Sequence, residues 1–224
     1  MDWQAFILTV KLAVLVTAIL LVLGLPLAYW LTYSRRRWKF LLEALVGMPL
    51  VLPPTVLGFY ILLALGSKSP IGRWWESLTG HTLAFTFEAL VIGSVVYSLP
   101  FTVQPLAAAF STVDRKFVAA SATLGASRLR TFFRIILPLS VSGLLTAIAL
   151  TFAHTMGEFG VVLMVGGNIP GITRTVSIDI YDQVQATNYA SANQTALVLL
   201  AISFVALSLV YALNRRVWAI WPWR

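Results

Sequence analysis

The sequence contains no cysteine and few charged residues. Without cysteine among its 224 residues, the chain has neither a disulfide framework nor a thiolate metal site. Charged residues make up only 11% of the chain, whereas hydrophobic residues make up 59%, and this balance is too apolar for an ordinary soluble domain of such length. The composition therefore predicts an integral membrane protein.

Residues for nucleotide binding and for catalysis are also missing. The phosphate-binding pattern Gly-x-x-x-x-Gly-Lys-Ser/Thr does not occur, because the segment 66–69 has the wrong residue order. Two histidines and no cysteine supply no obvious nucleophile, base and orienting group for an intramembrane enzyme. We therefore expect no catalytic residues, metal or cofactor in this chain.

Long uncharged segments divide the chain into five candidate transmembrane helices. Each segment contains at least 23 consecutive uncharged residues, and about 20 residues suffice to span the hydrocarbon as a helix. The first apolar run is too long for a cleaved secretory peptide. We predict an all-α membrane domain over residues 1–224, with helices at 6–33, 41–65, 83–110, 135–157 and 195–213.

Basic residues are unevenly distributed over the predicted loops. Twelve of the sixteen follow the first, third or fifth helix: Arg35, Arg36, Arg37, Lys39, Arg115, Lys116, Arg128, Arg130, Arg134, Arg215, Arg216 and Arg224. The other four are Lys11, Lys68, Arg73 and Arg174. Because basic loops stay cytoplasmic, the N-terminus is predicted outside and the C-terminus inside a cell (inner) membrane. The net charge of +8 thus reports orientation in lipid and does not indicate a nucleic-acid partner.

Prolines interrupt the second predicted helix. Pro53 and Pro54 lie in its middle, where proline breaks the hydrogen-bond ladder, and the freed carbonyl groups need partners other than lipid. Two interpretations remain open. Either the segment with Pro53, Pro54 and Thr55 faces a pore, or the prolines only kink the helix for packing.

The predicted inner loop, residues 111–134, has the pattern of two short helices joined by a glycine turn. Ser111 can cap a helix whose first turn holds Asp114, Gly125 can end that helix in a left-handed conformation, and Ser127 can cap the next one. The residues that define this element are Asp114, Ala119, Ala120, Ser121, Leu124, Gly125, Ala126 and Ser127. It can transmit force from a cytoplasmic partner, or lie on the anionic membrane surface. A DNA-binding helix-turn-helix would need a soluble core, which the sequence does not provide.

Ionisable residues near the outer ends of the helices form the remaining candidate site. His154 and Glu158, four residues apart, share a helix face. They lie either at the outer interface or, with Thr155, along a pathway bent at Gly157. Arg174 in the long outer segment either guides an anion or is simply solvated.

Residues 119–138 resemble the "EAA" loop of the permeases of importer-type ATP-binding-cassette transporters. That pattern is Glu-Ala-Ala, three residues, Gly, nine residues, and Ile-x-Leu-Pro. The matching residues here are Gly125, Ile135, Leu137 and Pro138. Ala119 occupies the position of the usual Glu, so the resemblance implies docking to an ATPase without the salt bridge of that Glu.

Two further stretches, residues 49–58 and 157–175, resemble the permeases of molybdate importers more than those for sulfate or tungstate. The resemblance covers the whole chain. It implies a pathway formed with a second copy of the chain, two cytoplasmic ATPase subunits that bind ATP and magnesium, and an external or periplasmic molybdate-binding protein. A passive anion channel would not explain the bent basic loop.

Overall fold

The computed structural model describes residues 2–220, and the side chains as far as residue 212. All regular structure in this part of the chain is helical. The elements are α1 (Trp3–Tyr33), α2 (Lys39–Gly47), η1 (Met48–Leu50), α3 (Pro54–Leu65), α4 (Pro70–Thr79), α5 (Phe87–Ser111), α6 (Arg115–Thr123), α7 (Arg128–Thr131), η2 (Phe132–Ile136), α8 (Leu137–Leu139), α9 (Val141–Met156), α10 (Gly160–Gly166), α11 (Val176–Gln185) and α12 (Tyr189–Ile220). Arg224 lies outside the described residues, as do the side chains of Arg215 and Arg216.

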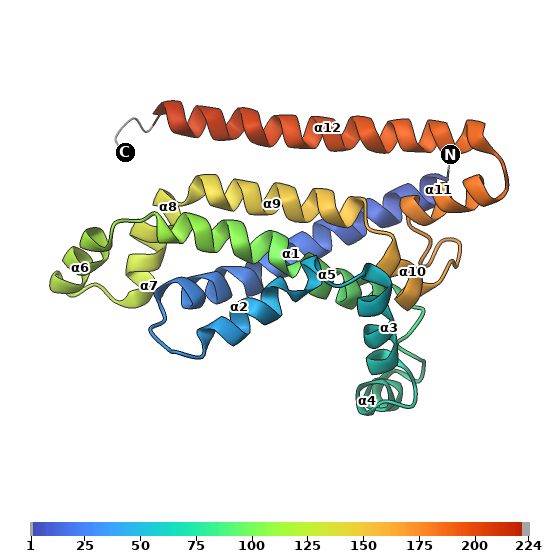
Figure 1. The fold of residues 1–224 in the computed structure, drawn as a ribbon, viewed down its shortest axis with the longest axis horizontal. Helices are drawn as coiled ribbons and strands as arrows, with labels where there is room; N and C mark the ends of the chain where they lie inside the picture. The colour runs from blue at the N-terminus through green and yellow to red at the C-terminus, as the bar shows by residue number, and fades with distance from the viewer. Residues whose placement is uncertain (1, 221–224) are drawn as a thin grey trace.

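Helices α1, α5, α9 and α12 lie roughly along the long axis of the molecule (Figure 1). Helix α5 packs against both α1 and α9, and α12 packs on α9 and α11. Among the described residues, three helices are long and apolar enough to cross a membrane by themselves: α1, α5 and the Tyr189–Ala212 part of α12. The all-α membrane fold expected from the sequence is confirmed.

The second predicted span, 41–65, is not one continuous helix. Helix α2 continues into η1, which ends at Leu50, and α3 begins at Pro54. The segments Lys39–Leu50 and Pro54–Leu65 meet at an angle of 111°. Pro53 is extended, and Pro54 takes the first position of α3, where the missing proline N–H costs no helical hydrogen bond. The change of direction is much larger than a packing kink, and it turns α3 across the long helices (Figure 1).

The fourth predicted span, 135–157, is also broken. The segment Arg128–Leu139 meets α9 at an angle of 77°, because Ser140 leaves the helical conformation (φ −112°, ψ 17°) directly after Pro138 and Leu139. Residues Phe132–Ile136 form a π-helical turn within the first part. The second short helix of the inner loop therefore does not continue straight into α9. The chain has five spans only if each bent pair counts as one.

Short helices occupy the two segments expected to be loops. Helix α4 lies in residues 66–81, and α10 and α11 lie in residues 158–193. Helix α11 is attached to α1, because the Val176 N–H donates to Thr9 Oγ1 over 2.9 Å. Thr9 Oγ1 itself donates to the Ala5 carbonyl over 2.7 Å. One hydroxyl thus joins the first helix to the start of α11.

Two apolar clusters form the interior. One contains Leu12 and Leu20 of α1, Leu90 of α5 and Val161 of α10. The other contains Ala28 of α1, Phe110 of α5 and residues of the segment that follows the inner loop. Close packing in the second region needs a glycine: a Cβ on Gly143 would lie 2.2 Å from Cβ of Ala109. The clusters lie toward opposite ends of the helices, and a different candidate site accompanies each.

Candidate functional site

The first site is the α6–α7 element, which projects from one end of the bundle (Figure 1). Asp114 is the N-cap of α6, since its carboxylate accepts a hydrogen bond of 2.8 Å from the Lys116 N–H. Ser111 does not cap this helix as predicted. It is the last residue of α5, and its hydroxyl donates to the Ala108 carbonyl over 2.7 Å, because α5 continues to the residue where the cap was expected.

Gly125 joins the two short helices in the predicted left-handed conformation, with φ of +74°. The Ala126 N–H donates to the Ser121 carbonyl and the Gly125 N–H to the Ala122 carbonyl, each over 3.0 Å, which is the double hydrogen bond of a Schellman helix end. Ser127 caps α7 by accepting a 3.3 Å hydrogen bond from the Arg130 N–H. These local predictions are confirmed.

A hydroxyl pair fixes the angle between α6 and α7. Ser121 Oγ and Thr131 Oγ1 lie 2.8 Å apart, and both residues are buried. Ser121 was predicted only as a small residue that permits close docking. Its partner is ten positions away across a turn, a distance at which no helical or strand period operates.

The tip of the element is exposed and apolar. Leu124 is 86% exposed and Leu129 is 70% exposed. The small residues nearby, Ala119, Ala120 and Gly125, are exposed as well. Exposed large aliphatic side chains next to small residues are typical of a protein contact. Arg115, Lys116, Arg128, Arg130 and Arg134 surround this tip along the chain.

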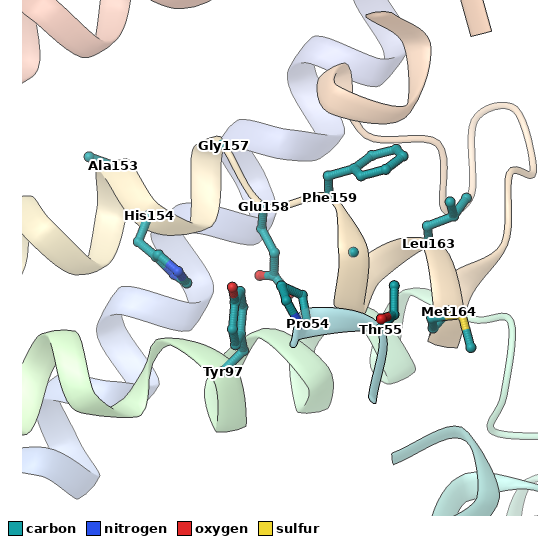
Figure 2. A pocket seen from close by; sticks show the side chains of 11 residues that line it. Pro54, Thr55, Tyr97, Ala153, His154, Gly157, Glu158, Phe159, Leu163 and Met164 are labelled. Atoms are coloured by element: carbon teal, nitrogen blue, oxygen red, sulfur yellow. The ribbon is translucent and has the colours of Figure 1, made fainter. Parts of the chain in front are cut away.

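The second site is a cavity of about 570 Å³ near the opposite end of α9. It lies where the start of α3, the middle of α5 and the α9–α10 junction meet (Figure 2). Its lining residues are Pro54, Thr55, Tyr97, Ala153, His154, Gly157, Glu158, Phe159, Gly160, Leu163 and Met164. Within the described part of the chain, no group of three or more His, Asp and Glu could hold a metal ion.

The cavity brings together most of the residues for which a pathway was considered. Pro54 and Thr55 line it from α3, and His154, Gly157 and Glu158 from the end of α9. Two of the predicted residues, Pro53 and Thr155, are not in its lining. Thr155 is buried against α5, where its hydroxyl lies 3.1 Å from Ser98 Oγ.

Glu158 is buried within the protein. Its exposed fraction is 4%, and neither carboxyl oxygen has a hydrogen-bond partner. Ser94 of α5 lies beside the carboxyl but does not meet hydrogen-bond geometry with it, since its hydroxyl is unpartnered too. Helix length placed Glu158 at the outer edge of the hydrocarbon, but the count assumed a straight helix, and the chain bends at Ser140.

Buried hydroxyl groups connect α5 to α9 between the two sites. Thr102 Oγ1 and Thr151 Oγ1 are 2.6 Å apart, and Ser98 Oγ lies 2.9 Å from His154 Nδ1. The imidazole also stacks on Phe101, with 3.9 Å between ring centroids. Sequence reasoning missed this seam, although the spacing of Ser94, Ser98 and Thr102 at every fourth position of α5 was a usable signal.

Gly160 permits the close contact that shapes the cavity. A Cβ added to it would lie 2.7 Å from Cβ of Pro54, nearer than two carbons can approach. A Cβ on Gly157 would meet only backbone oxygens at 3.7 Å and beyond. The start of α3 and the start of α10 therefore touch because residue 160 has no side chain.

Arg174 is neither free nor simply solvated. Its Nε donates to Asn168 Oδ1 over 2.7 Å, and its terminal nitrogen lies 3.5 Å from a carboxylate oxygen of Asp182. Asn168 Nδ2 donates to the same carboxylate. The positive charge is therefore paired within the segment that precedes α11 and within α11 itself.

The chain belongs to the family of binding-protein-dependent transport system inner membrane components, whose sequence profile matches residues 5–219. It is therefore a multi-pass membrane subunit of a transport system. It is 49% identical to the molybdenum transport system permease protein ModB of Azotobacter vinelandii, over 96% of this chain and 95% of that protein. It is 35% identical to ModB of Escherichia coli K12, over 92% of this chain and 90% of that protein.

Solved importers share the fold. A structure of the MetNI methionine ABC transporter in inward-facing conformations matches with a TM-score of 0.76 at 16% identity, covering 97% of this chain and 96% of that one. A bacterial alginate ABC transporter with a pentasaccharide-bound periplasmic protein matches with a TM-score of 0.77 at 14% identity, covering 96% and 78%. At such identity the likeness establishes the permease fold of ABC importers, and the EAA-loop resemblance agrees with it.

Proposed function

We propose that this chain is the membrane permease of an ATP-driven molybdate importer in the cell inner membrane, with tungstate as a possible second substrate. Two copies form the pathway. Two cytoplasmic ATPase subunits bind ATP and magnesium and hydrolyse the nucleotide, and an external binding protein delivers the anion. The observation that carries this proposal is the 49% identity to a molybdenum permease over nearly the full length of both chains.

The geometry supports the division of labour between subunits. The α6–α7 element is bent at Gly125 and held at a fixed angle by Ser121 and Thr131, and its exposed Leu124 offers a contact for a motor subunit. It connects directly to α5 and, through the break at Ser140, to α9. A push on this element therefore moves two of the long helices, and the cavity lies between them.

The proposed pathway runs through the cavity at the α9–α10 junction. Pro54, Thr55, His154, Gly157 and Glu158 line it. Pro53 and Thr155 support it from the adjoining turn and from the α5–α9 seam. The paired charge of Arg174 favours a structural role over anion guidance.

Reconstitution of the complete system in liposomes tests the proposal. Molybdate, tungstate and sulfate are all tetrahedral dianions, so selection is expected in the enclosed site of the binding protein. Binding protein loaded with molybdate or tungstate should accelerate ATP hydrolysis and uptake, whereas sulfate should have little effect. Equal stimulation by sulfate at equal occupancy would assign the chain to sulfate import, and anion flux without ATP would make it a channel.

A further inference from the structure

The cavity contains a carboxyl group that nothing neutralises. Glu158 is the one residue of the lining that is acidic, and no Lys or Arg lines the cavity. Figure 2 shows its side chain extending toward Pro54 and Tyr97. The titratable groups that face the cavity with it are His154 of α9 and Tyr97 of α5, while α3 and α10 contribute none to the lining.

Both carboxyl oxygens are closed off from solvent and accept no hydrogen bond from the described residues, although the hydroxyl of Ser94 lies beside them. An ionised carboxylate in such a place loses its hydration and faces no cation in the cavity lining, so its ionisation is costly. The surrounding membrane adds no relief, since ionisable groups within lipid need protein partners or water. A carboxylic acid that keeps its proton bears neither penalty, and it can donate as well as accept a hydrogen bond.

Charge is decisive here because the proposed substrate is a dianion. A negative carboxylate beside the cavity would repel such an anion strongly, since interactions between charges are least screened in a low-dielectric interior. The other polar groups of the lining, the hydroxyls of Thr55 and Tyr97 and the imidazole of His154, can form hydrogen bonds without adding negative charge. The lining can therefore accommodate an oxyanion only when Glu158 is uncharged.

We propose that Glu158 is an uncharged carboxylic acid in the wall of the anion pathway, and that ionisation of this group blocks passage of the anion. This inference rests on the proposed function, because it takes the cavity to be the pathway of a dianion. It predicts that transport needs the absence of charge at position 158 and not the acid itself. The closest neutral equivalent of the side chain is glutamine.

The test compares wild type with Glu158→Gln in the full complex with ATPase and binding protein. ATP-driven molybdate uptake is measured from mildly acidic to mildly alkaline buffer. Wild-type uptake should fall several-fold toward alkaline pH, while Glu158→Gln should stay active at neutral pH and hold its rate where wild type declines. Glu88→Gln, which removes an exposed carboxylate of α5, controls for a general effect of charge and should follow wild type.

Two transport results would overturn the inference. One is an assembled Glu158→Gln complex that is inactive at neutral pH, which would mean that the carboxylate itself is needed. The other is a decline of Glu158→Gln uptake with pH in parallel with wild type, which would place the titrating group elsewhere in the complex.

Infrared spectroscopy of the permease gives a second readout that needs no transport. At neutral pH, wild type should show a protonated-carboxyl band that is missing in Glu158→Gln and, if that variant does not assemble, in Glu158→Leu. Identical spectra for wild type and variant would refute the uncharged carboxyl. If the band is present but the wild-type complex does not transport molybdate, the proposed function fails and the assignment of Glu158 as an uncharged acid stands.

Discussion

The α6–α7 element and the cavity at the α9–α10 junction differ in almost every physical respect. The first is exposed, basic and shaped by contacts between residues near in the sequence, such as Asp114 with Lys116 and Ser121 with Thr131. The second is a partly open, mostly apolar cavity assembled from segments more than one hundred residues apart, such as Pro54 and Gly160. A part that contacts a partner must be accessible, whereas a part that passes an anion must exclude lipid and fixed negative charge.

The largest effect is expected from Gly125→Val, which tests the first region alone. Valine in a left-handed conformation costs roughly 1–3 kcal/mol, and because no atom lies within 4 Å of the added Cβ, the strain comes from the backbone. ATPase association and uptake should fall about tenfold or more. Gly80→Val is the matched control, since Gly80 also has positive φ (+77°) and open space but ends α4. Equal loss in both variants would show that the bent loop has no special role.

Gly160→Ala tests the cavity without changing the α6–α7 element. The new methyl group would collide with Pro54, so α3 and α10 must separate and the cavity changes shape. Uptake should fall several-fold while the ATPase still binds. Gly157→Ala, whose methyl group meets only ordinary contacts, should transport like wild type. Loss of ATPase binding in Gly160→Ala would mean that the two regions are not separable.

A smaller effect is expected from breaking the hydroxyl pair of the α6–α7 element. Ser121→Ala and Thr131→Val should each weaken ATPase affinity by about 1 kcal/mol, the usual worth of one neutral hydrogen bond, or roughly fivefold. The double variant should cost little more than either single variant, because the interaction is already lost. Fully additive effects in titrations of the ATPase would contradict the coupling of α6 to α7 through these hydroxyls.

The smallest effect is expected at Arg174. Its charge has either a structural role or a role in guiding the anion, and the two roles predict different changes in uptake when Asp182 is neutralised. As a partly exposed ion pair, Arg174 and Asp182 contribute about 0–1 kcal/mol. Arg174→Gln and Asp182→Asn should therefore each change uptake by less than about twofold and in the same direction. If Arg174 guides the anion, Asp182→Asn would free its charge and raise the uptake rate. Initial rates at low ionic strength, where screening is weakest, distinguish the two.

The contrast between the regions also explains what the sequence could predict. Helix caps and glycine turns depend on a few neighbouring residues, so Gly125 and Ser127 were predicted correctly, and apolar runs indicated the membrane helices. The cap at Ser111 failed because α5 extends further than propensity indicated. The positions of Glu158, Thr155 and Arg174 depend on contacts with α5 and α11, and a pattern along one helix does not contain them.

The breaks at Pro53 and Ser140 show the same limit within single spans. Hydropathy identifies a length of apolar chain but not its direction. The second span was therefore predicted only as interrupted or kinked at its prolines, and the fourth as one continuous helix. The observed bends are 111° and 77°. Pro53 and Pro54 were a local signal for the first bend, and Pro138 was a weaker one for the second.

The central claim is that the α6–α7 element faces the cytoplasm, whereas the cavity lies toward the outer side of the membrane. Single cysteines at Leu124, in this element, and at Ser67, before α4, can be introduced into a chain with no cysteine of its own. With the permease expressed alone, an impermeant thiol reagent added to intact cells should label position 67 and should label position 124 only after permeabilisation. Labelling of position 124 from outside would contradict the account, because no cytoplasmic ATPase could reach that loop.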